Sequence, residues 1–239
     1  MSFLSKIKKI MRQRRKYRQI CVDNDVQIAT TDIARIVFDI QGKHNTIKIG
    51  KLRKLSGKIR ISIAGNNNSV VIDDGFGISG ELRITIGQIH PNFGSVENVL
   101  LQIGANTSME GCNITTYNSH AKIIIGANCM FSSNINLYHT DGHPIFDAQT
   151  HKIINHVKTM HIGNHVWVGA NATVLKNVTI PDGAIVGLGA VVSKYRYDIQ
   201  DAATAGGIVL SGNPARVVRS GVLWSPDGSS GYVQNNWEI

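Results

Sequence analysis

Residues 162–194 read IGNHVWVGANATVLKNVTIPDGAIVGLGAVVSK, and a β-branched aliphatic residue returns at every sixth position. A period of six fits neither the 3.6-residue repeat of a helix nor the two-residue alternation of one long strand. It predicts short strands separated by corners and stacked coil upon coil, with one aliphatic side chain per strand facing inward. The series is Ile162, Val168, Val174, Ile180, Val186 and Val192, and four positions after the first five come Val166, Ala172, Val178, Ala184 and Ala190.

Residues that tolerate tight corners stand between these aliphatic positions. They are Gly163, Gly169, Gly183, Gly187 and Gly189, with Asn164, Asn171 and Asn177. Gly187 and Gly189 fall within the period, so we interpret them as corners and not as a dinucleotide-binding fingerprint. The period continues upstream at Ile103 and Met109, and at Ile125, Phe131 and Leu137, with irregular β-rich runs before that. Irregular terminal coils are common in solenoids, so we predict one solenoid over residues 25–194.

Composition agrees with one principal domain. The chain has 239 residues, of which 42% are hydrophobic and 24 are glycines, and no Pro/Ser-rich linker divides it. It has no run of 18 apolar residues and no secretory signal, so we expect a cytoplasmic protein. Cys21, Cys112 and Cys129 are scattered and odd in number, which argues against a disulfide framework or a thiolate metal site.

The net charge of +9 is concentrated at the N-terminus. Residues 1–22 contain eight Lys or Arg residues and no acidic residue, so the rest of the chain is nearly neutral, which argues against a nucleic-acid-binding surface. Apolar residues at helical spacing between Phe3 and Met11 predict a basic amphipathic helix over residues 3–18. It could lie on an anionic membrane surface, or pack against the domain or an oligomer partner.

The hexads, together with GNPARVV at residues 212–218, resemble the left-handed parallel β-helix acyltransferases that carry hexapeptide repeats. GHPI at residues 142–145 is similar to galactoside and maltose acetyltransferases, whereas TDGHPIFD at 140–147 and the aromatic-Ser-Ser of Phe131–Ser133 are closer to O-acetyltransferases of sialic acid polymers and other capsule or lipopolysaccharide glycans. The resemblance implies an all-β, left-handed β-helix over residues 23–195 with a protruding catalytic loop at 139–161. A short N-terminal helix within residues 1–22 and a C-terminal extension at 196–239 complete the expected organisation.

Acetyl transfer to a sugar hydroxyl needs a base, oxyanion donors and two substrates held together. Six of the nine histidines fall between His139 and His165, where the repeat breaks. The family's catalytic base matches His143, with Asp141 as a candidate to orient its imidazole. His139 is a candidate substrate contact or second base.

The resemblance also implies where acetyl-CoA and the acceptor bind. Trp167 should face out of the prism against the bound substrates and belong to both the catalytic and the cofactor site. The CoA residues implied are Gly169, Ala170, Gly187, Leu188, Lys194, Arg216 and Arg219, and the acceptor residues are Asn113, His139, Ser132 and Ser133. The predicted protein is therefore a homotrimer with sites between subunits, using acetyl-CoA and no metal to acetylate a bacterial surface-polysaccharide sugar or its precursor.

Three alternatives stay open. The same fold also carries N-acetylation of nucleotide-linked amino sugars, and a solenoid can be a non-catalytic scaffold. A zinc site is the third, because H-x-x-x-H occurs at His139/His143 and at His161/His165. Gly142 and Pro144 oppose the helix that such a pair needs, and the G-H-x-x-x-x-H-G-C pattern of gamma-class carbonic anhydrases is missing.

Overall fold

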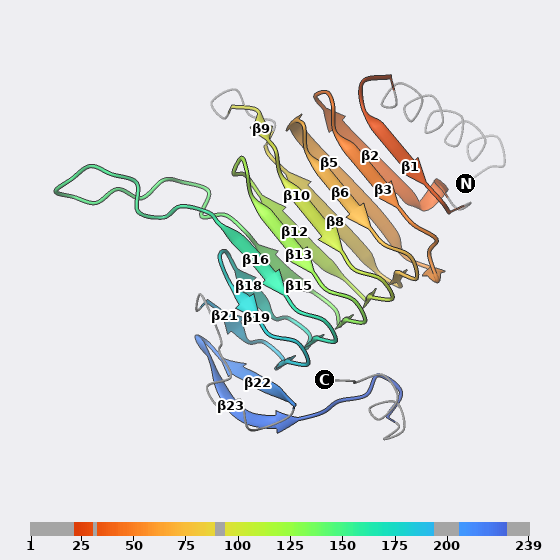
Figure 1. Cartoon of the computed structure of the whole chain (residues 1–239), viewed down its shortest axis with the longest axis vertical. Helices are drawn as coiled ribbons and strands as arrows, with labels where there is room; N and C mark the ends of the chain where they lie inside the picture. Colours follow the sequence, from red (N-terminus) through yellow and green to blue (C-terminus); the bar gives the residue numbers. More distant parts are fainter. Residues whose placement is uncertain (1–21, 31–32, 89–93, 194–205, 229–239) are drawn as a thin grey trace, which may run out of the picture.

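The chain winds into a three-sided prism of stacked parallel strands, shown in the computed structural model of Figure 1. The structure describes residues 22–30, 33–88, 94–193 and 206–228. The predicted helix at residues 3–18, Cys21 and Lys194 lie outside these ranges. No helix in the described ranges is long and apolar enough to cross a membrane.

Each turn of the chain contributes one strand to each of three sheets, A, B and C. Sheet A contains β1 (Asp25–Ile28), β3 (Thr46–Ile49), β6 (Ser69–Ile72), β10 (Leu100–Ile103), β13 (Lys122–Ile125), β16 (Thr159–Ile162) and β19 (Thr179–Ile180). Sheet B contains β2 (Ile36–Gln41), β5 (Lys58–Asn66), β8 (Glu81–Ile86), β12 (Cys112–Thr116), β15 (Ile135–Tyr138), β18 (Thr173–Leu175) and β21 (Val191–Val192), with β9 (Val96–Glu97) pairing β5. Sheet C contains β4 (Lys54–Leu55), β7 (Gly77–Ile78), β11 (Ser108–Met109), β14 (Met130–Phe131), β17 (Trp167–Val168), β20 (Ile185–Val186), β22 (Gly207–Gly212) and β23 (Ala215–Val222), and the 3-10 helix η1 is Ile33–Arg35.

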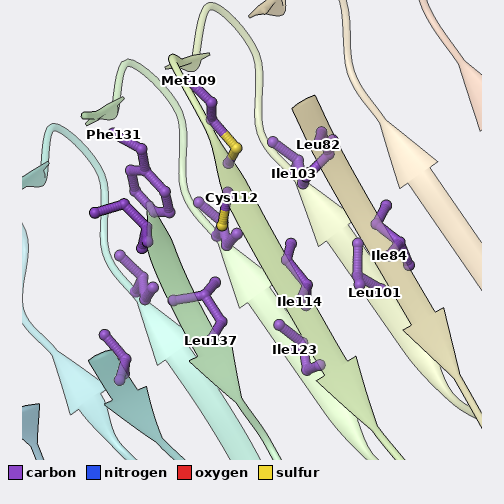
Figure 2. Close-up of a cluster of buried hydrophobic side chains, with 14 of the residues drawn as sticks. Leu82, Ile84, Leu101, Ile103, Met109, Cys112, Ile114, Ile123, Phe131 and Leu137 are labelled. Atoms are coloured by element: carbon purple, nitrogen blue, oxygen red, sulfur yellow. The ribbon is translucent and has the colours of Figure 1, made fainter. Parts of the chain in front are cut away.

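The six-residue period produces the core as predicted. All eleven residues of the two aliphatic series between Ile162 and Val192 have no exposed surface. Upstream coils bury larger side chains at equivalent places, and Figure 2 shows Met109, Phe131 and Leu137 within one continuous interior. These inward residues fill the prism, so its core is solid. The parallel sheets and the solved structures of similar fold make it the left-handed parallel β-helix that was predicted. Cys112 and Cys129 are free and buried, and burial raises the pKa of Cys129 to about 11, as expected of structural thiols.

The corners depend on asparagine more than on glycine. Asn171 and Asn177 adopt left-handed backbone angles, with φ of 60° and 61°, as the corner interpretation predicts. At the N-terminal end, two buried asparagines form an internal ladder that the hexad pattern does not reveal. The Asn68 side chain donates to Asn45 Oδ1 and to the Val96 carbonyl, both at 3.0 Å, and its Oδ1 accepts the Val99 amide.

Two departures from the repeat position the functional residues. Between β15 and β16 the chain leaves the corner of sheets B and A as a long arm, residues 139–158, which projects from the prism in Figure 1. The predicted loop end at residue 161 is wrong by three residues, because 159–161 already pair with β13. At the C-terminal end, β22 continues sheet C beside β20 and β23 turns back antiparallel to it.

Candidate active site

The base of the arm is held by a network centred on Asn155. Its Nδ2 donates to Asp141 Oδ2 at 2.7 Å and to the His143 carbonyl at 2.9 Å, and its Oδ1 accepts the Ile145 amide at 2.8 Å. Lys176, on the prism just after β18, pairs with the same Asp141 oxygen and donates to the Asn155 carbonyl at 2.7 Å. The two limbs of the arm are therefore tied to each other and to the prism directly beside His143.

This network also gives Asp141 a structural role. Burial would raise the pKa of its carboxyl, but the Lys176 ammonium and the Asn155 amide outweigh burial and hold that pKa below its ordinary value. Asp141 is therefore ionised at neutral pH, with Oδ2 engaged by Lys176 and Asn155. Asp141 thereby supports the backbone that carries His143, and its orientation of the imidazole stays a prediction.

His143 itself is exposed and lines a cavity of about 340 Å³ at the foot of the arm. The cavity lies between the arm and the turn after β12, with lining residues Tyr117, Asn118, Ser119, Thr140, Asp141, Gly142, His143, Pro144, Ile153, Asn155, His156 and Val157. An accessible imidazole on an anchored backbone meets the first requirement for a general base.

His139 cannot contact a substrate in this structure, so that prediction is wrong. The residue is completely buried, its Nε2 lies 3.3 Å from the Lys158 carbonyl, and its Nδ1 has no hydrogen-bond partner among the described residues. Burial lowers the pKa of His139 to about 4, which leaves the ring neutral at pH 7. His139 therefore packs the corner from which the arm departs.

Trp167 lies on the outer face of sheet C, as predicted, and it is 37% exposed. The C-terminal segment returns to it: the Trp224 ring is 5.9 Å from the Trp167 ring, centroid to centroid, and stacks on His165 at 4.1 Å with an interplanar angle of 9°. Trp224 Nε1 donates to the His165 carbonyl at 2.9 Å, and His165 Nε2 lies 3.1 Å from the Trp224 carbonyl. Trp224, stacked on His165, therefore packs against Trp167 and supports it from one side.

Of the predicted acceptor residues, the structure brings Ser132 to Trp167. Both line a groove of about 630 Å³ on sheet C, which runs toward the N-terminal coils, and the Ser132 hydroxyl is 3.5 Å from Glu110 Oε2. Ser133 is exposed at the next corner and does not line this groove. Asn113 lies on sheet B, where its Nδ2 donates to Asn136 Oδ1 at 3.2 Å, and it lines neither cavity.

Of the predicted CoA residues in the described ranges, Arg216 and Arg219 lie on the other side of Trp167 from this groove. Outward positions of sheet C follow the register Trp167, Ile185, Val209 and Arg219, so an exposed guanidinium stands three strands from the indole. Arg216 is also exposed on β23, and Leu188 is 74% exposed at a corner. Packing explains why residue 169 is a glycine, because a Cβ there would lie 2.8 Å from the Leu188 amide nitrogen. These residues fit a long ligand with phosphates at its Arg219 end.

In the described ranges, no three His, Cys, Asp or Glu side chains converge as a metal site would require. His139 is buried while His143 is exposed, and His161 points outward from β16 while His165 packs on Trp224. Neither H-x-x-x-H pair therefore presents two imidazoles toward a common point.

No model of a known protein family matches the sequence. The chain is 34% identical over 166 residues to the polysialic acid O-acetyltransferase of Neisseria meningitidis, a match that spans 67% of this chain and 69% of that one. It is 29% identical over 123 residues to a polysialic acid O-acetyltransferase of Escherichia coli O1:K1 / APEC, spanning 52% and 37%, and 31% identical over 107 residues to galactoside O-acetyltransferase of Escherichia coli K12, spanning 45% and 48%.

Among solved structures, the polysialic acid-specific acetyltransferase NeuO superimposes with a TM-score of 0.59 at 25% identity, over 85% of this chain and 95% of that one. The polysialic acid O-acetyltransferase OatWY has the same fold, with a TM-score of 0.56 over 89% and 92%. With this β-helix and these relatives, the chain is a hexapeptide-repeat acetyltransferase. The chain belongs to the O-acetyltransferase family that includes the polysialic acid enzymes.

Proposed function

We propose that the enzyme transfers an acetyl group from acetyl-CoA to a sugar hydroxyl of an acidic bacterial surface polysaccharide, with His143 as general base. The observation that carries the proposal is the anchored, exposed His143 at the foot of the arm. The acceptor class is supported by the relative from Neisseria meningitidis, which acts on polysialic acid by name.

The site is composite and requires a second subunit. His143 lies at the corner of sheets B and A, whereas Trp167 lies on sheet C, the side of the prism opposite that corner. The arm also exposes large apolar side chains that one prism leaves uncovered: Ile145, Phe146, Ile153 and Ile154 are 41% to 61% exposed. Apolar surface of this kind is typical of interfaces. In a cyclic trimer, each arm would bring its His143 to the Trp167 face of the neighbouring prism.

Transfer would proceed by direct attack in a ternary complex. His143 accepts the proton of the sugar hydroxyl as the oxygen attacks the thioester carbonyl, and backbone amides stabilise the oxyanion. Collapse of the tetrahedral intermediate breaks the C–S bond, and the imidazolium protonates the departing thiolate. CoA would lie along sheet C from Trp167 toward Arg219, with Arg216 and Lys194 near its phosphates and the backbone at Gly169–Ala170 and Gly187–Leu188 beside its pantetheine arm.

The same proposal assigns a location. The enzyme would act in the cytoplasm, where acetyl-CoA is made. The eight basic residues within 1–22 would hold it at the anionic inner face of the membrane, close to the nascent polysaccharide.

Labelled acetyl-CoA and a panel of glycans, offered to the wild type and to His143→Ala, test the function. We expect the wild type to form an alkali-labile acetyl ester on an acidic glycan, and the variant to lose at least a hundredfold in kcat. Equal transfer by the two proteins would refute the role of His143, and an alkali-stable amide on an amino sugar would replace O-acetylation by N-acetylation.

A further inference from the structure

The groove on sheet C extends well beyond the reacting centre. Outward positions follow the register Lys54, Gly77, Ser108, Met130 and Trp167 on β4, β7, β11, β14 and β17. These five positions span four strand spacings of about 4.8 Å, so the groove is roughly 19 Å long. Trp167 stands at one end and the cations Arg53 and Lys54 stand at the other.

Gly77, one strand away from Lys54, keeps the groove open beside its cationic end. A Cβ at Gly77 would meet only the side chains of Arg53 and Lys54, at 3.7 Å or more, and its φ is not left-handed. Gly57 and Gly80 differ, because a Cβ there would lie less than 2 Å from a backbone oxygen of the next coil. The backbone at Gly77 therefore tolerates a side chain. The effect of having glycine at this position is to leave space in the groove.

The lining has the chemistry of a carbohydrate site. Ser79, Ser108 and Ser132 offer hydroxyls along the groove, and Met130 with the Trp167 indole offers apolar surface. Such a combination suits sugar rings, which carry hydroxyls at their edges and C–H groups on their faces. Arg53 and Lys54 are both exposed and cationic, whereas the carboxylate of Glu110 lies nearer Ser132. Acidic groups of a ligand would therefore bind at the Arg53 end.

We propose that this groove binds the acceptor as an extended acidic glycan chain, with its carboxylates at Arg53 and Lys54 several sugars away from the unit acetylated beside Trp167. The inference rests on the proposed function and deepens it: the acceptor is the polymer and not its nucleotide-linked precursor. A nucleotide sugar also carries anionic groups, but its phosphates adjoin the sugar, whereas the cations stand about 19 Å from Trp167.

Two kinds of variant test the groove in the full-length protein. Arg53→Glu combined with Lys54→Glu reverses the charge at the far end, and Gly77→Ala followed by Gly77→Leu fills the adjoining space in two steps. Lys48→Glu, an equally exposed cation on sheet A, is the control for charge. The melting temperature of each variant shows whether it folds.

The first readout is the Kd for fluorescein-labelled polysialic acid, which does not depend on turnover. We expect a rise of about tenfold in Kd for the charge reversal and for Gly77→Leu, a smaller rise for Gly77→Ala, and none for Lys48→Glu. The second readout is the ratio of kcat/KM for long polysialic acid to that for a sialic acid trimer, which should fall with the same ranking.

The two proposals fail separately. The wild type could bind polysialic acid, more tightly than Gly77→Leu does, and yet transfer no acetyl group to it. That result would refute the proposed function and still support the groove as a glycan-binding site. The opposite result is acetyl transfer to polysialic acid by the wild type, with the same Kd and the same chain-length preference in the folded charge-reversal and Gly77→Leu variants. It would refute the groove as the polymer-binding site. So would a wild type that prefers nucleotide-linked sialic acid to the polymer.

Discussion

If His143 and Trp167 of one site come from two subunits, two inactive variants should complement each other. His143→Ala keeps an intact Trp167 and Trp167→Ala keeps an intact His143. In a cyclic trimer each site joins the arm of one subunit to sheet C of the next. Every trimer that contains both variants then has one site of three in which an intact arm meets an intact sheet C, so about 33% of the wild-type activity should return in purified mixed trimers.

The assay is acetyl transfer after the differently tagged variants are coexpressed and mixed trimers are purified through both tags. A mixture of Trp167→Ala with the double variant His143→Ala/Trp167→Ala is the matched control, because none of its sites can be complete. Mass spectrometry shows whether the subunits have mixed. If they have, and the activity of the first mixture is no higher than the summed activities of the two single variants, the composite site is refuted.

Four further predictions test single features. His139→Phe should remove a source of acid sensitivity. Because burial lowers the pKa of His139 to about 4, the unfolded chain binds more protons than the folded chain below pH 6.5. Between pH 7.5 and 5 the free energy of unfolding, measured by urea titration, should therefore fall by about 2 kcal/mol more in the wild type than in the variant. Parallel losses would contradict this. Lys176→Met should lower kcat about tenfold by loosening the arm, with KM for acetyl-CoA and the melting temperature nearly kept; an unchanged kcat would show that His143 does not need the network. Trp224→Ala should reduce kcat roughly fivefold, the equivalent of ~1 kcal/mol of aromatic contact, and Trp224→Phe should restore most of it, whereas no rescue would point away from stacking. Asn68→Leu should destabilise the N-terminal coils by about 3 kcal/mol in hydrogen exchange, because three buried partners lose their hydrogen bonds, and protection equal to that of the wild type would be the contrary result.

The prism was predictable because each coil repeats one physical requirement. From β17 to β21, a strand of two or three residues buries a single side chain. The core residues therefore recur at every sixth position, and this pattern is visible without knowledge of distant pairing. Asn171 and Asn177 were predictable as corners for the same reason, since a left-handed residue is needed at the same place in each turn. The Asn45–Asn68 ladder was not, because a buried amide is satisfied only by groups one coil away, about 20 residues distant in sequence.

The site was predictable only in part. His143 stands where the period breaks, and a break is visible in sequence. The bonds that hold it are not: Asn155 reaches Asp141 across 14 residues of an irregular arm, and Lys176 reaches them from the prism. No local pattern distinguishes His139, which is buried, from His143, which is exposed, although they stand four residues apart.

The regular and irregular halves of the prism differ in chemistry as well as in sequence. From Trp167 toward Arg219, sheet C continues from the two-residue hexad strands β17 and β20 to the longer pair β22 and β23, and it presents the features that suit a coenzyme. From Trp167 toward Lys54, the coils have irregular spacing and present serines, Gly77 and cations. A donor common to many acetyltransferases constrains the first half, because any change of spacing would move Arg219 relative to Trp167. The acceptor differs between enzymes, so the second half is where insertions and substitutions can alter specificity without disturbing the acetyl donor.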